Sequence, residues 1–166
     1  MKKALWVLAV VVAGLGAYAA NVLATPAVGQ STTTLGKALA AAPVDLSGHA
    51  KQPGGGWRAR VHTHGFSDFY VIDNTFTPRG TSGWHSHPGP SLIFVVKGQI
   101  TNYIGSDPSC TPHVYSAGQS FTDLGGTQVH MLRNEGSVDA ETIAVQLLPK
   151  DATRRIDEPD PLNCHF

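Results

Sequence analysis

Three histidines carried by two separate parts of the chain have the residue type and spacing of a metal site. His85 and His87 are two positions apart, and His130 comes much later in the sequence. On an extended segment, side chains two positions apart point to the same side of the strand. A third imidazole from a later strand would complete a three-histidine face and leave coordination positions of the metal open. The sequence therefore predicts a site for one divalent transition metal (iron, copper, zinc, nickel or manganese), and imidazoles are poor ligands for magnesium or calcium.

The segments that carry these histidines belong to a pattern of short strands. From Trp57 onward, short alternating runs are separated by turn residues, which is typical of an all-β sandwich or barrel. The runs cover residues 57–63, 68–77, 84–87, 92–97, 99–104, 113–116, 120–122, 129–133 and 141–148. Since no long run with helical period follows Gly56, we expect a single all-β domain.

The spacing around His85 and His87 resembles the first motif of the cupin superfamily, whose members are small antiparallel jelly-roll β-barrels with a metal site inside. In that motif a glycine, five residues, His-x-His, three or four residues, a glutamate, six residues and a glycine follow one another. Here Ser91 and Gly98 stand at the last two positions, and four residues instead of five lie between Gly80 and His85. The spacing from the histidines onward is therefore that of the family, with serine in place of the glutamate.

The second motif of the family runs from a glycine to a histidine and then, after three residues, to an asparagine. Gly118, His130 and Asn134 supply these positions in the same order. The resemblance covers residues 57–148 and implies an antiparallel jelly-roll barrel there. It also implies that His130 and the two histidines of the first motif hold the metal.

The serine at position 91 removes a carboxylate that the family usually supplies. Three-histidine cupins of this kind exist, and some resemble thiol or diketone dioxygenases that hold ferrous iron. By this resemblance, the loss of the carboxylate leaves three positions for substrate and dioxygen, or it marks a lineage that only binds. Ser91 either holds a metal-bound water or fills a plain core position.

Candidates for acid–base or substrate roles are fewer. Gln99 and Tyr103 have an even spacing, so both are expected on one face of their strand, and His113 and Tyr115 form a second such pair. The alternative for each tyrosine is packing on a barrel strand with its hydroxyl at the rim. Asp123 is the one acidic residue within the motifs, and it is expected to cap a turn.

A second His-x-His pair, His62 and His64, lies in the first predicted strand. It has no partner motif elsewhere in the chain. The pair is therefore either a second metal site or two solvated side chains on an open face.

The ends of the chain are expected to lie outside the barrel. Two lysines, an apolar run and small residues are the pattern of a secretory signal peptide over residues 1–24. Its removal would leave a secreted or periplasmic protein, and the alternative is an uncleaved membrane anchor. Residues 25–56 predict a linker or N-terminal arm, within which residues 32–42 suit either a short helix or an edge strand. Residues 149–166 predict a polar C-terminal tail.

Cys110 and Cys164 are the two cysteines of the chain. In an exported protein an isolated pair most simply forms a disulfide, which here would tie the C-terminal tail to the middle of the domain. The alternative is a pair of soft metal ligands, but the chain has no Cys-x-x-Cys spacing.

Composition and charge narrow the class of partner. The formal net charge is zero and there is no basic patch, so a nucleic-acid partner is not expected. Apart from the signal segment, no stretch is long and apolar enough to span a membrane. Because a small barrel encloses at most one small ligand, we expect a small-molecule partner. The resemblance to cupins also implies a homodimer.

Three functions are compatible with these observations. The first is a redox enzyme, a small-molecule dioxygenase with iron or copper at the three histidines. The second is a non-redox lyase, isomerase or hydrolase in which the metal acts as a Lewis acid. The third is a non-catalytic module that binds a small ligand or a metal. The sequence does not decide whether the protein is an enzyme, because this architecture hosts enzymes, sensors and storage proteins alike.

Overall fold

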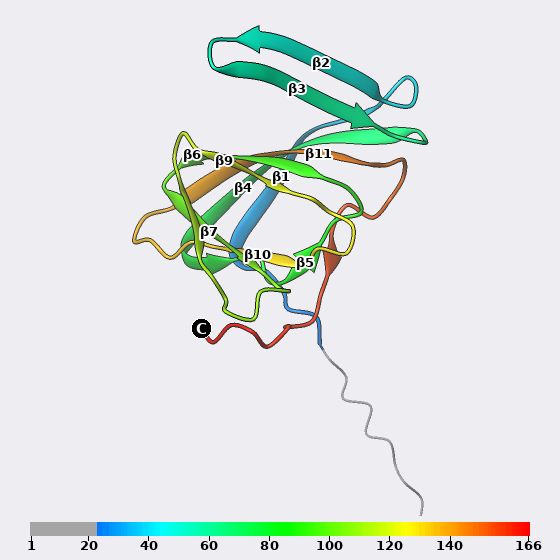
Figure 1. The fold of residues 1–166 in the computed structure, drawn as a ribbon. Helices are drawn as coiled ribbons and strands as arrows, with labels where there is room; N and C mark the ends of the chain where they lie inside the picture. Colours follow the sequence, from blue (N-terminus) through cyan, green and yellow to red (C-terminus); the bar gives the residue numbers. More distant parts are fainter. Residues whose placement is uncertain (1–22) are drawn as a thin grey trace, which may run out of the picture.

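The computed structural model describes residues 23–166, which form a barrel-like antiparallel sheet and a separate hairpin (Figure 1). The barrel strands are β1 (Val28–Leu39), β4 (Ser67–Thr81), β5 (His85–Ser86), β6 (Ser91–Lys97), β7 (Gln99–Ile104), β8 (His113–Ser116), β9 (Ser120–Asp123), β10 (His130–Arg133), β11 (Ala140–Pro149) and β12 (Ile156–Asp157). The hairpin consists of β2 (Asp45–Gln52) and β3 (Gly55–His62) and lies beyond one end of the barrel. The predicted all-β jelly-roll class is confirmed.

The described residues contain no helix, and therefore none that could cross a membrane. The predicted signal peptide, residues 1–24, falls almost wholly outside the part of the chain that the structure describes. The same holds for the alternative of an uncleaved anchor. Both stay predictions.

The barrel has different boundaries from the predicted 57–148. β1, within the segment expected to be a linker or arm, pairs along almost its whole length with β4, which pairs with β11 on its other side. Three consecutive threonines, Thr32 to Thr34, suit such a strand because β-branched side chains pack well on a pleated surface. The region 57–63, expected to be the first barrel strand, instead lies mainly in β3 of the hairpin.

The interior of the barrel has an apolar part and a polar part. Ile72, Phe76 and Ile93 belong to a buried apolar cluster built from β4, β6, β7, β9, β10 and β11. The polar part contains Ser82, His85, His87, Ser91, Asn102, Asp123, His130, Thr142 and Gln146, all buried. Burial of polar groups is unfavourable unless they are satisfied, so this concentration inside one barrel marks the region in which chemistry is expected.

The C-terminal tail is part of the barrel wall. β12 pairs with β5, which places Asp157 opposite His85 and Ile156 opposite Ser86. A disulfide joins Cys110 to Cys164, with 5.2 Å between the two Cα atoms. The tail is therefore fixed at two points, one of them beside the histidine strand.

An ion pair joins β1 to the start of β4. Lys37 Nζ lies 3.0 Å from Asp68 Oδ2, and the backbone N–H of Asp151 donates to the same oxygen at 3.0 Å. The hydrogen bond from Asp151 and the bond to Lys37 lower the pKa of Asp68 below its ordinary value. The carboxylate of Asp68 thus links the added strand, β4 and the segment that follows β11.

We expect replacement of both Cys110 and Cys164 by serine to lower the free energy of unfolding by about 4 kcal/mol. The physical reason is that the crosslink, with a sequence separation of 54 residues, restricts the unfolded chain. Equilibrium unfolding in urea measures the change. A Ser109→Ala variant beside the same bridge should unfold like the wild type. Equal midpoints for the serine variant and the wild type would contradict the prediction.

We expect Asp68→Asn to lower the melting temperature at pH 7, with a difference from the wild type that narrows as the pH falls below about 4. The pKa of Asp68 is lower in the folded state than its ordinary value of 3.8. The stabilisation of the folded state by the ionised Asp68 carboxylate is therefore complete well above pH 3.8. It is lost as the pH falls through the folded-state pKa. Melting curves at several pH values test this, with the exposed Asp139→Asn as the control. A difference independent of pH would contradict the ionic explanation.

Candidate metal centre

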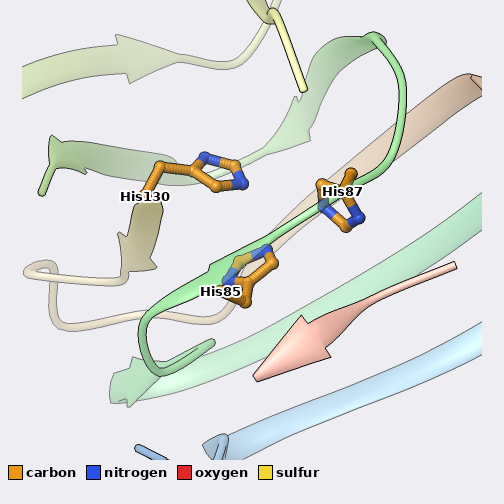
Figure 2. A group of neighbouring side chains, drawn as sticks. All are labelled: His85, His87 and His130. Atoms are coloured by element: carbon orange, nitrogen blue, oxygen red, sulfur yellow. The ribbon is translucent and has the colours of Figure 1, made fainter. Parts of the chain in front are cut away.

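The three predicted histidine ligands lie together inside the barrel. His85 begins β5, His87 follows it, and His130 begins β10, which is paired with β5 so that His130 stands opposite His85. One ring nitrogen from each residue lies within 4.8 Å of those of the other two, and all three side chains are buried. Figure 2 shows the rings grouped, two from one segment and one from another. The alternation of a strand and one register of pairing therefore produce the three-histidine face.

Hydrogen bonds orient the three rings. Each Nδ1 atom lies near an oxygen that only accepts: Gly83 O for His85 (2.9 Å), Arg154 O for His87 (2.7 Å) and Asn102 Oδ1 for His130 (3.2 Å). His87 Nδ1 also lies 3.4 Å from Nε2 of Gln146, but its 2.7 Å contact to Arg154 O is much closer. The oxygen partners therefore assign the proton to Nδ1 of each ring, and each Nε2 is left with its lone pair. An imidazole that donates one N–H to such a partner and presents its other nitrogen is the usual arrangement of a metal ligand.

The surroundings keep these imidazoles neutral. Burial is the main cause that lowers the pKa of all three below the ordinary 6.5, and neighbouring histidines and Arg155 add to the effect for His85. Burial lowers the pKa of His130 to about 4, although the carboxylate of Asp123 acts in the opposite direction. Neutral imidazoles are the form that binds metal ions, so the site is in the ligating state at neutral pH.

The position of Asp123 beside the histidines was not predicted from the sequence. Its Oδ1 accepts a hydrogen bond from the N–H of Gly125 at 2.9 Å, which confirms the expected turn cap. Its Oδ2 points to the histidines, 3.6 Å from Nε2 of His130 and 3.9 Å from Nε2 of His87. This oxygen is buried and has no hydrogen-bond partner. The side chain therefore caps a turn with one oxygen and faces the metal site with the other.

Ser91 lies in the wall of the same cavity. Its hydroxyl accepts a hydrogen bond from Nε2 of Gln146 at 3.0 Å, and Oε1 of Gln146 accepts from the guanidinium of Arg154 at 3.3 Å. The cavity has a volume of about 120 Å³ and is also lined by the three histidines and Arg155. Ser91 therefore lies at a hydrogen-bonded position in the cavity wall, and its holding of a metal-bound water stays a prediction.

The candidates for acid–base roles lie elsewhere. Tyr103 packs beside the disulfide and donates from its hydroxyl to Glu135 at 3.3 Å, and Tyr115 stacks on Phe121 with 4.3 Å between ring centroids. Gln99 and His113 are exposed. None of the four lines the cavity. The alternation along β7 is as expected, but Asn102 and not its neighbour Tyr103 contacts the histidines, so the inward face is the opposite one.

The second His-x-His pair remains outside the barrel. His62 ends β3, and its ring lies edge-on to that of His64 with 5.0 Å between centroids. Both side chains are exposed. Within residues 23–166, the one group of three side chains placed to hold a metal is that of His85, His87 and His130. Of the two alternatives for His62 and His64, the solvated one agrees with the structure.

Comparison with known proteins points to the same architecture. The family model described as "Cupin domain" matches residues 74–146, and no curated protein matches the chain. A structure of oxalate oxidase is similar at 21% identity and a TM-score of 0.46, over 54% of this chain and 45% of that chain. A Klebsiella pneumoniae protein with a double-stranded β-helix domain is similar at 22% identity and a TM-score of 0.46, over 54% of this chain and 75% of that chain. The polyketide cyclase RemF from Streptomyces resistomycificus follows at 16% identity and a TM-score of 0.45, over 56% and 64%.

These three similarities are weak, with identities under 25% and TM-scores under 0.5, and this chain covers 45% of the oxalate oxidase chain. The family match is more informative, because residues 74–146 include the strands that carry all three histidines. It agrees with the two motifs by which the sequence resembled this family. Residues 74–146 of this protein form a cupin domain.

Proposed function

We propose that the protein is an exported metalloprotein that binds one divalent transition metal through His85, His87 and His130. The observation that carries the proposal is the convergence of three buried imidazoles whose Nδ1 atoms are each engaged by a carbonyl oxygen. The donor set fits a metal, because buried Nε2 of His130 and buried Oδ2 of Asp123 lack any hydrogen-bond partner. A bound cation would satisfy both atoms.

The chemistry that we propose for the site is oxidation of a small organic molecule by dioxygen. A divalent iron or copper ion held here would supply open coordination positions and redox activity. The chain's own residues orient the ligands through their Nδ1 atoms, and they enclose a small cavity in a buried region. The second candidate is a non-redox reaction with zinc as a Lewis acid, because three histidine ligands also suit zinc.

The walls of the cavity favour an anionic ligand. Arg155 is neutralised by Asp157, with 2.7 Å between Nε and Oδ1. Arg154 also lines the cavity, and among the described residues no carboxylate lies within ion-pair distance of it. Burial, and then the charge of Arg155, lower the pKa of Arg154, although it remains a cation. We therefore propose a ligand that carries a carboxylate, and the volume of about 120 Å³ restricts it to a small molecule.

Export and self-association complete the proposal. Export rests on the signal-peptide pattern of residues 1–24 and agrees with a disulfide between Cys110 and Cys164. The homodimer stays a prediction that rests on the resemblance to cupins.

We expect the purified wild type to carry about one transition metal per chain, and His87→Ala to bind it at least about 100-fold more weakly, because one of three ligands is lost. Elemental analysis and competition with a chelator measure this. His113→Ala removes an exposed histidine and is the matched control. If the wild type carries iron or copper, the next assay is oxygen uptake. If it carries zinc, the next assays are Lewis-acid reactions. Full metal retention by His87→Ala would refute the assignment.

We expect Arg154→Gln to weaken binding of acetate to the zinc-loaded protein by about 10-fold, because a charge-assisted hydrogen bond to a carboxylate is lost. Isothermal titration calorimetry measures the affinity. Arg58→Gln, which removes an exposed guanidinium from the hairpin, should leave it unchanged. Equal acetate affinity for Arg154→Gln and the wild type would show that this guanidinium does not recognise the anion.

A further inference from the structure

A buried carboxylate oxygen faces two of the three histidines at the candidate metal centre. We infer that Asp123 is a fourth protein ligand of the metal, and that it takes the place of the glutamate that cupins carry at the position of Ser91. The inference depends on the metal binding proposed above. It extends the ligand set from three imidazoles to three imidazoles and one carboxylate, the carboxylate coming from a different strand.

The register of β6 and β9 explains how a carboxylate on β9 can replace one on β6. Ser91 on β6 is paired with Asp123 on β9, so the two residues are directly opposite each other. Both are buried and thus face the interior of the barrel. Directly opposite residues on one face have Cβ atoms about 5 Å apart, so a carboxylate on either strand can reach the same part of the cavity. A serine on β6 leaves room for the side chain from β9.

The groups around Asp123 favour a bound cation. Among the described residues, no lysine or arginine forms an ion pair with this carboxylate; its charged-group neighbours are His87 and His130. Their Nδ1 protons are directed to Arg154 O and Asn102 Oδ1, so their Nε2 atoms present lone pairs. A lone pair and an anionic oxygen 3.6 Å apart repel each other in a buried site unless a positive ion lies between them.

The turn after β9 holds the carboxylate in this orientation. The hydrogen bond from Gly125 N–H fixes Oδ1, and Oδ2 is thereby directed to the histidines. Gly125 has a φ of 68°, and a Cβ atom at this residue would lie 2.2 Å from the carbonyl oxygen of Gly89. The turn is thus packed directly against the loop that follows His87. The position of Asp123 relative to His87 is therefore set by close backbone contact.

The fourth ligand changes what the metal can do. With three neutral imidazoles a divalent ion keeps its full double charge, whereas one carboxylate reduces the charge of the site to a single positive unit. One fewer coordination position is then open to substrate and dioxygen. The carboxylate oxygen is also a harder donor, in the hard–soft acid–base sense, than the imidazole nitrogens.

The test uses cobalt(II) as the probe, added to the metal-free full chain. Asp123→Asn is nearly isosteric, and its side-chain oxygen can still accept from Gly125 N–H, so the turn cap is kept. We expect cobalt to bind this variant at least about 10-fold more weakly and with a changed visible absorption spectrum. The double variant Ser91→Glu/Asp123→Asn returns a carboxylate from the opposite strand. We expect it to regain most of the lost affinity.

Asp107→Asn is the matched control, because Asp107 also caps a turn, through the N–H groups of Ser109 and Thr111, but lies outside the cavity lining. It should bind cobalt like the wild type. If Asp123→Asn has the affinity and spectrum of the wild type, Asp123 is not a ligand and the three-histidine site still stands. If the wild type itself binds no cobalt, both the fourth ligand and the proposed metal function are overturned.

Discussion

The pairing of His130 with His85 is the contact on which the site depends. β5 is only two residues long, yet it lies between β10 and β12 and is held by both. Histidines far apart in the sequence become neighbours because these short strands meet in one register. A shift by one residue would turn His85 and His130 to opposite faces of the sheet. Burial of the surrounding side chains excludes such a shift, because it would move polar groups out of their hydrogen bonds and apolar groups into water.

The C-terminal tail beyond β11 supplies one wall of the metal cavity that the other strands do not provide. The carbonyl of Arg154 orients His87, β12 supports the histidine strand, and Arg155 donates to the carbonyl of Ser82 at 2.6 Å. The disulfide at Cys164 fixes the end of this segment. The C-terminal residues therefore act as one wall of the metal cavity, in addition to covering the apolar cluster around Trp84. Stability of the tail and function of the site are physically linked.

The polar half of the barrel interior is maintained by a connected set of partners. Gln146 joins Ser91 to Arg154, and Asn102 orients His130. Buried polar groups of this kind are tolerated when each finds a partner. Three buried atoms that line or face this cavity lack a partner: His130 Nε2, Asp123 Oδ2 and Thr142 Oγ1. His130 Nε2 and Asp123 Oδ2 lie 3.6 Å apart, so the protein alone is incomplete at the point where these two atoms face each other.

The sequence by itself determined the all-β class, the two motifs, the three histidines and the cysteine pair, because these depend on local alternation and on residue types at fixed spacing. It did not place β1 in the barrel, since the threonines and alanines of residues 32–42 are compatible with several local structures. Nor did it separate the two faces of β7, where Asn102 and not Tyr103 contacts the histidines. Only the tertiary structure brought Asp123 opposite Ser91 and Arg154 beside Gln146. Such pairs are set by the register of strands distant in sequence, and that register follows from packing of the whole barrel, which no local pattern encodes.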